Sequence, residues 1–572
     1  MGAAAVPPAG KTLEAWQAID GWVKRWKAPG EAQAIDPAGT KGACVTLRLS
    51  GQVIGRATRM GESGSTAWMA ARDAMVEANQ RFPVERDAMR EEHIAEMLPR
   101  VMVDVQVAGT LVPLLGETFD AAAMELSPGI DGVAARAGDK TIGFFPGVML
   151  ATGTTPAEAM RSAAGEIGLP PLELGQLRKV HGLVVYRFSC RHLAACAPGE
   201  QPRFLMRGGS VIPLASVSMT GLRQFADRAA AHLMMHDWPG SEPNGMTGDY
   251  KPVMDRFEPV VAPPLEQSVA AMALLRYAAT TGTAPSDAEK ARKFAARVLG
   301  DLKTIADGEE DPLTSVPSAS AFVAAWWEAR RWDEGAFPLD DEFYGRAVVQ
   351  VKTALLASGE WNGEVPGAAR ALAALAMVRA SEGESSLRTS AERAVRSLFR
   401  DTSRGDLVSM MPWLGWAELE LAGAKGEVPS LAALVDMRQT MWKFQLADAD
   451  VGECLDFTGG LLFTRSRNPL PTWTTLRPVA FAATMLSDER LTPPDLFARE
   501  LSSLRRSMRF MFQLAPDDAA AHMYRDPKRA MGGVRRAVWD QTLGLDSTAL
   551  SLLAACEVLK AITPAATPEN GR

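Results

Sequence analysis

Two patterns of apolar and polar positions divide the chain, and the change between them falls near residue 256. Before it, short runs place apolar residues at every second position, which predicts strands with one buried face. Between these runs, apolar residues recur at helical spacing without a breaker. The predicted strands are 43–49, 52–57, 102–108 and 182–190, and the predicted helices are 11–27, 67–80, 157–165 and 222–236.

The segment 129–150 has the clearest local structure in this first part. Its composition predicts a glycine-rich turn followed by two short strands, 133–136 and 141–145, joined by a loop of about four residues. We interpret it as a hairpin that seals an α/β core. The alternative is that Phe144 and Phe145 form a wall beside a binding groove.

After residue 256 the strands disappear, and Ala- and Leu-rich helical segments follow one another between Gly, Pro, Asp or Ser residues. Eleven such segments suit a closed ring of helical hairpins better than an open bundle, and a twelfth would complete six pairs. The predicted helices are 265–280, 286–305, 318–332, 341–357, 365–382, 386–400, 409–423, 429–444, 474–487, 494–514 and 545–562.

A chain of 572 residues exceeds what one hydrophobic core accommodates, so at least two domains are expected. We predict an α/β domain with an N-terminal helix at 1–200 and a connector at 201–255. An all-α domain then spans 256–565, and 566–572 is a disordered tail. The fold class is therefore multidomain, α/β followed by a ring of helices.

The composition narrows the function classes. A net charge of −7 argues against nucleic-acid binding, which needs a basic stripe. The chain contains no run of about 18 uncharged apolar residues, so a membrane span is not predicted. The five cysteines form no CxxC pair, so reduced thiols in a cytoplasmic location fit best. His232 and His236 lie one helical turn apart, but we favour a structural role for them. We predict neither a metal nor another cofactor.

The order of elements in the first part resembles the AMMECR1 family over roughly residues 40–200. The resemblance rests on the strand GACVTLRL at 42–49, the Arg81-Phe82 pair after a helix and the strand MVDVQVAG at 102–109. It continues through the GIDGV turn at 129–133 to a strand that ends in FFP at 144–146. It implies an α/β domain, and the family has no settled reaction to transfer.

One departure from that family affects function. The family's LRGC motif, followed by an apolar residue and Gly, should fall at 53–57. Only Gly55 is retained there, with Ile54 where Arg is expected and Arg56 where Cys is expected. If the motif carries an activity, this chain has lost it or uses the fold differently.

The second part resembles the α/α-toroid proteins, a group that includes sugar epimerases, glycoside hydrolases, terpene cyclases and lanthionine synthetases. The resembling residues are Tyr250-Lys-Pro, Asp255-Arg-Phe-Glu258, the helix from Glu266 to Tyr277, and Gly532-Gly-Val-Arg535 ahead of Asp546. The resemblance implies an (α/α)6 ring with a central pit and does not specify a reaction.

Loops at one end of the inner helices of such a ring would surround a pit suited to a ligand. Acids and aromatic or basic residues near predicted helix ends are therefore the candidates for chemistry. The candidate catalytic residues are Asp340, Glu360, Glu364, Asp456 and Asp540. The candidate ligand-binding residues are Trp361, His522, Tyr524, Arg525 and Arg535. Helix capping, polar loops and core packing are the alternative roles for the same residues.

Two functions stay open at this point. One is a binding or assembly protein in which the α/β domain and the pit jointly hold a small molecule, a carbohydrate or peptide polymer, or a protein partner. The other is a carbohydrate-active toroid enzyme that uses paired carboxylates. The first is favoured because the family motif of the α/β part is altered and no catalytic group in the ring is well defined.

Overall fold

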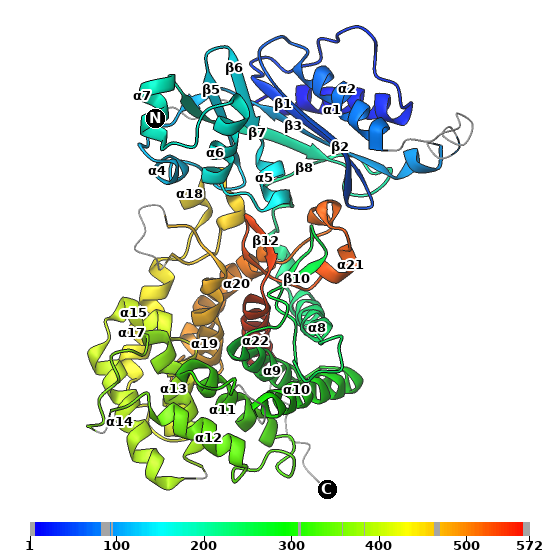
Figure 1. Cartoon of the computed structure of the whole chain (residues 1–572). Helices are drawn as coiled ribbons and strands as arrows, with labels where there is room; N and C mark the ends of the chain where they lie inside the picture. The colour runs from blue at the N-terminus through cyan, green and yellow to red at the C-terminus, as the bar shows by residue number, and fades with distance from the viewer. Residues whose placement is uncertain are drawn as a thin grey trace.

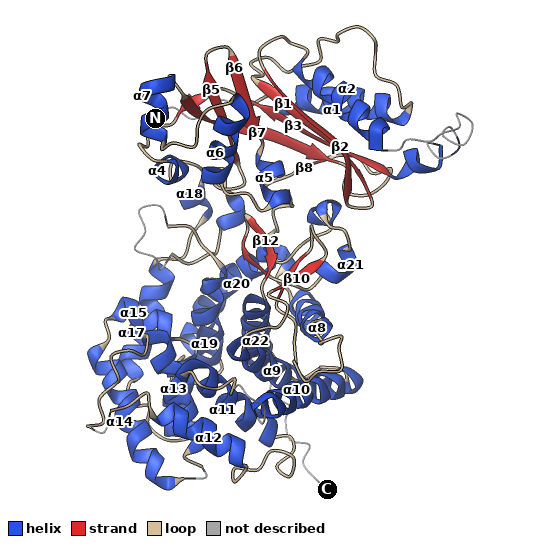
Figure 2. Ribbon diagram, viewed as in Figure 1, coloured by secondary structure: helices blue, strands red, loops and turns tan. Residues whose placement is uncertain are grey.

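The computed structural model describes residues 6–563 except 82–91, 93–94, 307–310, 357, 383 and 463–468. These residues form an α/β domain and a helical domain, stacked end to end with the α/β domain at the top of Figure 1. A small second sheet lies where the two meet (Figure 2). The predicted fold class is confirmed. The tail predicted at 566–572 lies outside the described residues.

The α/β domain is built on an antiparallel sheet with strand order β2-β1-β3-β7-β5-β6, and two short strands, β4 and β8, also pair with β7. Its strands are β1 Gly42–Leu49, β2 Gln52–Met60, β3 Val101–Ala108, β4 Val112–Pro113, β5 Asp131–Ala137, β6 Lys140–Phe144, β7 Val184–Ala194 and β8 Arg203–Phe204. Its helices are α1 Ala9–Lys24, α2 Thr66–Arg81, α4 Phe119–Ala123, α5 Pro146–Thr152, α6 Pro156–Ile167 and α7 Leu174–His181, with the 3-10 turn η1 Leu98–Arg100.

Both faces of the central strand β3 are covered, which its alternating pattern did not predict. Helices α1 and α2 pack Trp16 and Trp68 on one face, where Trp16 Nε1 donates to the carbonyl oxygen of Val103 at 3.1 Å. The polar residues Asp104 and Gln106 point to the other face and are buried as well. Buried polar groups are stable only with partners, so this face must supply them.

The segment 129–150 folds as a hairpin of β5 and β6, with a turn at Gly138-Asp139 that is shorter than predicted. Phe145 is fully buried, and its ring meets the Phe188 ring edge-on at a centroid distance of 5.0 Å. The alternative interpretation of Phe145 as a groove wall is therefore wrong, because the phenyl group belongs to the core beneath the sheet. Helix α6 then begins with a capping box between Thr155 and Glu158.

Six inner helices of the second domain form a closed ring. Each inner helix contacts the next in the order α9, α11, α13, α16, α19, α22, and α22 packs back on α9. Gly415 permits the α16–α19 contact, because a Cβ there would lie 2.3 Å from the Phe481 ring. The inner helices are α9 Pro264–Ala279, α11 Val316–Arg330, α13 Gly367–Ala380, α16 Trp413–Ala422, α19 Leu476–Leu486 and α22 Leu545–Ile562.

Six outer helices alternate with the inner ones along the chain, as an (α/α)6 ring requires. The twelfth helix is α8, which lies in the segment predicted as a connector and packs against α9 and α22. The segment predicted as one helix at 409–423 is two, because Pro412 has no N–H to continue the first. The outer helices are α8 Met219–Met235, α10 Pro285–Ala306, α12 Glu342–Lys352, α14 Ser385–Asp401, α17 Leu431–Lys443 and α20 Pro494–Leu514, and α15 Arg404–Met410 precedes α16.

Short elements that the sequence did not predict form the junction between the domains. A four-stranded sheet with order β10-β9-β12-β11 lies at the N-terminal ends of α9 and α22. Its strands are β9 Asp249–Lys251, β10 Arg256–Glu258, β11 Arg535–Ala537 and β12 Asp540–Leu543. The other short elements are α18 Asp448–Val451 and α21 Pro527–Ala530, with 3-10 turns η2 Leu214–Ser216, η3 Leu455–Phe457, η4 Trp473–Thr475 and η5 Ala520–Met523.

The turn of the β1–β2 hairpin presses on the helical domain. Gly51 has φ +75°, and a Cβ there would lie 1.9 Å from the carbonyl oxygen of Tyr524. Tyr524 is fully buried in an apolar cluster with Met523 from the same segment and Ala151 from the α/β domain. The two domains are therefore packed together, and not merely tethered.

A buried ion pair adds to this contact. Arg207 follows β8 of the α/β domain, and its Nε donates to the carbonyl oxygen of Pro128 at 2.7 Å. Its Nη1 pairs with Asp456 of η3 at 2.6 and 2.5 Å, and each side chain is 1% exposed. The guanidinium also lies over the Phe457 ring, 4.1 Å from its centroid.

Replacing Asp456 by Ala leaves the Arg207 guanidinium buried without its counter-charge. We expect Asp456→Ala to lower the free energy of unfolding by about 3–5 kcal/mol, measured by urea unfolding. Glu200→Ala is the control, because it breaks the exposed Arg203–Glu200 pair and should cost less than about 1 kcal/mol. Equal effects of the two substitutions would contradict a structural role for the buried pair.

Candidate ligand-binding pit

A pit of about 1140 Å³ opens at the centre of the helical ring. Its lining comes from the last turns of the inner helices and the residues that follow them, including Thr280, Thr281, Ser487 and Asp488. Helices α9 and α22 start next to β10 and β12 at the junction with the α/β domain (Figure 1), so the pit lies at the opposite end of the ring. The described lining residues all belong to the helical domain. The sequence, in contrast, predicted a ligand shared with the α/β domain.

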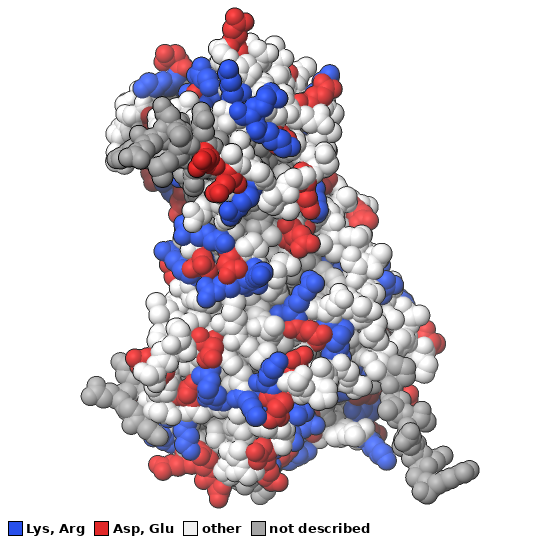
Figure 3. Space-filling view, turned by 90° about the vertical axis from the view of Figure 1, so that its right-hand side faces the viewer, with Lys and Arg blue, Asp and Glu red and all other residues white. Residues whose placement is uncertain are grey.

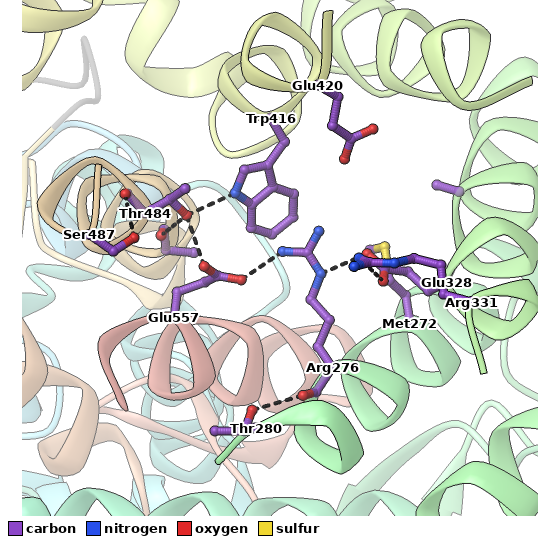
Figure 4. Close-up of polar contacts among 12 residues, drawn as sticks. Met272, Arg276, Thr280, Glu328, Arg331, Trp416, Glu420, Thr484, Ser487 and Glu557 are labelled. Carbon is purple, nitrogen blue, oxygen red and sulfur yellow. Dashed lines mark hydrogen bonds and ion pairs between the residues drawn. The ribbon is translucent and has the colours of Figure 1, made fainter. Parts of the chain in front are cut away.

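Charged side chains from five inner helices join at this end of the ring in an Arg–Glu belt, made of Arg276, Glu328, Arg379, Glu420 and Glu557. Arg276 donates from Nε to Glu328 and from Nη1 to Glu557, both at 2.8 Å. Arg379, whose side chain is fully buried, donates from Nη2 to Glu328 at 3.0 Å and to Glu420 at 2.8 Å. Figure 4 shows Arg276 between Glu328 and Glu557. The belt thus ties the ring together across its centre.

The belt sets the charge state of its members. Burial alone would raise the pKa of Glu328, but Arg276 and Arg379 outweigh it and lower that pKa to about 2. Burial would lower the pKa of Arg276, and the surrounding glutamates raise it instead. Glu328 is therefore an anion at neutral pH. It is suited to accept hydrogen bonds and not to donate a proton to a leaving group.

Two tryptophans stand beside the belt. The Arg276 guanidinium lies 3.8 Å from the ring centroid of Trp416, whose Nε1 donates to Thr484 at 2.9 Å (Figure 4). The Arg379 and Arg331 guanidinium groups lie 4.4 and 5.0 Å from Trp327. Cation–π contacts of this kind hold the rings in place and present a mixed aromatic and polar surface to the pit.

The carboxylates predicted as catalytic do not converge on the pit. Asp340, Glu360 and Glu364 are exposed, and none of them lines it. Trp361 is half-buried, packs against the helical core and donates from Nε1 to Ser397 at 2.9 Å. The neighbouring Asp341 caps α12 by accepting from the backbone N–H groups of the first turn. The catalytic roles of the three carboxylates and the ligand-binding role of Trp361 stay predictions.

The remaining predicted residues gather at the junction, not in the pit. Tyr524 donates from its hydroxyl to Gln541 at 2.7 Å, and Arg535 is buried with its guanidinium on three backbone carbonyl oxygens. Arg525 is exposed, and Asp540 accepts from the backbone of Thr542. Two further predicted residues, Asp456 in its pair with Arg207 and His522 near Asp104, are buried between the domains.

Sequence reasoning missed the Arg–Glu belt. Its five residues are dispersed from position 276 to position 557, and each resembles an ordinary charge on a helix. A signal was nevertheless present. Arg276, Arg379 and Glu557 each follow a long, mostly apolar run with no polar face, and helices of that composition are buried. A charge in that position requires a partner, so these residues predict one another once the ring closes.

A second polar cluster lies at the junction end of the ring. Arg536 Nη2 lies 3.0 Å from Asp249, 3.4 Å from Asp546 and 3.9 Å from Glu266. Burial, together with Asp546 and Asp249, raises the pKa of Glu266 to about 7 despite Arg536. Burial also raises the pKa of Asp249. This cluster can exchange protons near neutral pH, whereas Glu328 in the belt cannot.

His232 and His236 face each other with 3.3 Å between their Nε2 atoms. The Nδ1 of His236 lies 2.8 Å from the carbonyl oxygen of Gly248, and the Nδ1 of His232 lies 3.0 Å from that of Arg529. Both rings are buried and connect α8 to the junction, as the structural role favoured from the sequence requires.

The geometry defines the class of protein, an α/β domain built on an antiparallel sheet and joined to a ring of paired helices, an α/α toroid. No family model and no curated protein sequence matches the chain. Among solved structures, an uncharacterized protein from Pyrococcus horikoshii is 19% identical, with a TM-score of 0.25, and the match covers 34% of this chain and 96% of that one.

Two toroid structures match a larger share of the chain. An inactive variant of the α-1,6-mannanase GH76A of Salegentibacter sp. HEL1_6, in complex with α-1,6-mannotetrose, is 10% identical with a TM-score of 0.42. That match covers 59% of this chain and 99% of the mannanase. Cellobiose 2-epimerase from Bacillus thermoamylovorans B4167 is also 10% identical, with a TM-score of 0.42, over 59% of this chain and 100% of the epimerase. These likenesses concern the fold, and no activity is transferred from them.

The raised pKa of Glu266 predicts a pH-dependent stability. Native Glu266 holds its proton more tightly than an unfolded glutamate. The contribution of this protonation to the free energy of unfolding is therefore fully present below the unfolded pKa of 4.5 and is lost as pH rises through about 7. We expect Glu266→Gln to match the wild type in free energy of unfolding at pH 5. At pH 8 the variant should be the more stable protein. Urea unfolding at both pH values tests this, and an unchanged difference between them would contradict it.

Proposed function

We propose that this protein binds a polar, uncharged ligand, of oligosaccharide type, in the pit of its toroid domain. The observation that carries the proposal is the Arg–Glu belt beside Trp416 and Trp327 in an open pit of about 1140 Å³. Hydroxyl groups both donate and accept hydrogen bonds, so they match a surface on which carboxylates alternate with guanidinium groups. Trp327, which is half-buried, supplies apolar contact for a sugar face, whereas Trp416 is 3% exposed and supports the Arg276 guanidinium.

The charge of the lining supports an uncharged ligand. Four basic residues line the pit, and they face five acidic residues, which gives a formal net charge of 4 − 5 = −1. A nearly balanced lining attracts neither a polyanion nor a polycation strongly. The basic lining residues are Arg276, Arg331, Arg490 and Lys560, and the acidic ones are Glu328, Glu420, Asp488, Glu489 and Glu557.

The distribution of charge on the protein surface also supports an uncharged ligand. Lys and Arg are interspersed with Asp and Glu over the face in Figure 3, without a basic stripe. None of the described helices has the length and apolar character needed to cross a membrane. A cytoplasmic location is part of the proposal, supported by the five cysteines, all of which are unpaired. A partner protein on the α/β domain is compatible with this role.

In this proposal the toroid binds its ligand and does not catalyse a reaction on it. The belt carboxylates are engaged with arginines, and Glu328 is held in its ionised form. A glycoside hydrolase requires one carboxyl group that is protonated before the reaction and a second that is ionised. Among the described residues that line the pit, no two carboxyl groups combine a raised pKa on one with a lowered pKa on the other.

A second candidate function is acid–base catalysis, the carbohydrate-active alternative, located at the junction end of the ring. The specific observation in its favour is Glu266, whose pKa of about 7 lies near the value that suits a general acid at neutral pH. Asp546 and Asp249 would be the ionised partners, with Asp540 close enough to raise the pKa of Asp249. Release of reducing sugar by the wild type, abolished in Glu266→Gln, would favour this function.

The binding function is tested by thermal shift followed by calorimetry on the full chain. The panel contains neutral oligosaccharides, short peptides and polyphosphate, because a true ligand stabilises the native state by mass action. We expect a neutral oligosaccharide to raise the melting temperature and Trp327→Ala to weaken its binding about tenfold, or ~1.4 kcal/mol. Arg331→Ala should weaken binding similarly, since Arg331 covers Trp327 at the rim.

Lys293→Ala is the matched control, because Lys293 is exposed on α10, away from the pit, and pairs with Glu289 one turn away. Its affinity should equal that of the wild type. A shift with polyphosphate alone, or binding that Trp327→Ala and Arg331→Ala leave unchanged, would overturn the proposal.

A further inference from the structure

Three buried side chains from both domains meet at the contact between the α/β sheet and the helical domain. Asp104 of β3 and His192 of β7 belong to the sheet, and His522 lies in η5. One ligand atom of each lies within 4.8 Å of those of the other two. The three residues are 3%, 6% and 2% exposed, so water competes little for them.

The orientation of His522 leaves one of its nitrogens without a partner. Its Nδ1 lies 2.6 Å from the carbonyl oxygen of Ala519, so Nδ1 carries the proton and donates it. Its Nε2 is buried, has no hydrogen-bond partner among the described residues and lies 3.9 Å from Asp104 Oδ2. If Nε2 is unprotonated, a lone pair faces a carboxylate. If it is protonated, 3.9 Å is too long for a hydrogen bond, so Nε2 is unsatisfied in either state.

We propose that Asp104, His192 and His522 bind a divalent transition metal of the zinc class at the domain interface. Two imidazoles and one carboxylate are a common ligand set for zinc and for iron(II). The donation from His522 Nδ1 to a backbone carbonyl is the outer-shell contact that usually orients a metal-binding histidine.

The distances fit such an ion with small shifts. Ligand atoms about 2.1 Å from a tetrahedral zinc lie roughly 3.4 Å from one another. Asp104 Oδ1 is 2.9 Å from His192 Nε2, and the other carboxylate oxygen, Oδ2, is 3.9 Å from His522 Nε2. One ligand atom of each residue lies within 4.8 Å of the others, so the three ligands must draw together on the ion. Three protein ligands leave a fourth position for another group.

Arg48 defines what that fourth ligand must be. Its Nε lies 4.0 Å from Asp104 Oδ2, is buried and has no hydrogen-bond partner among the described residues. Arg48 already balances the charge of Asp104, so a divalent cation would leave two positive charges uncompensated. The site therefore takes an anion with the metal, hydroxide or a carboxylate, to which Arg48 Nε donates. Because His522 comes from the helical domain, the ion would also fasten the two domains.

The ligands lie far apart in the sequence, so spacing could not reveal them. Of the three, the sequence singled out only His522, as a ligand-binding residue near the toroid. The other two are inward-facing positions of strands, where a polar residue resembles the solvent-facing half of an alternating pattern.

The test uses the full chain, stripped with a chelator and titrated with Co²⁺ and Zn²⁺. We expect one equivalent of each metal to bind, with visible Co²⁺ absorption typical of tetrahedral nitrogen and oxygen ligands. Added acetate should change that spectrum, and Arg48→Met should reduce the change. His522→Gln and His192→Gln should each weaken metal affinity at least 100-fold. His181→Gln, on the exposed end of α7, is the control and should bind as the wild type does.

Absence of stoichiometric metal binding to the wild type would overturn the proposal. Binding that survives both His192→Gln and His522→Gln would do the same, and loss in His236→Gln alone would place the ion at the His232–His236 pair. If His522→Gln does not fold, His192→Gln and the Co²⁺ spectrum of the wild type decide the question, since both histidines are required.

Discussion

Closure of the ring of inner helices is the constraint on which the helical domain depends. A buried arginine or glutamate without a partner costs several kcal/mol, and the belt supplies partners between neighbouring inner helices. An open stack would keep Arg379 paired with the helices on either side of it, but it would separate Glu557 of α22 from Arg276 of α9. The belt therefore favours the closed ring over other packings and, in closing it, forms the polar surface of the pit.

The α/β domain covers the other end of the ring. Arg207 reaches from the sheet domain to Asp456, while the segment of η5 presses Tyr524 against the β1–β2 turn at Gly51. The ion pair matches a charged group of one domain with its partner in the other, which fixes the orientation in which the two domains meet. The two domains are therefore packed together, and the pit lies at the end of the ring away from the α/β domain.

Much of the fold could be predicted from the sequence, because long periodic segments carry their own signal. The hairpin of β5 and β6 and helices such as α9, α20 and α22 lie within a few residues of the predicted ranges. The junction sheet could not be predicted, since strands of three or four residues have no period to detect. The alternating pattern of the strand 102–108 places Asp104 and Gln106 on its polar side. They are buried because a second layer covers that side.

The candidate site was harder to predict than the fold. Sequence reasoning selected acids that are close to one another in the chain, such as Glu360 and Glu364, and these are exposed outside the pit. Residues that meet in a closed ring come instead from equivalent turns of successive helices, tens of residues apart. Only the three-dimensional closure identifies them. The general signal is a charge in the C-terminal half of a helix with no polar face, as at Arg276 and Glu557.

The two ends of the ring differ in what their acids can do, and the helix dipoles do not explain the difference. Glu266 lies in the first turn of α9, where the positive end of the dipole should favour its anion, yet its pKa is raised. Burial and the nearby Asp546 and Asp249 outweigh the dipole, and Arg536 is shared among all three acids. Glu328 is in the last turn of α11, the less favourable end for an anion, and two arginines lower its pKa. The ratio of arginines to acids, set by which helix ends meet, thus lowers the pKa of Glu328 in the pit and leaves the pKa of Glu266 raised at the junction.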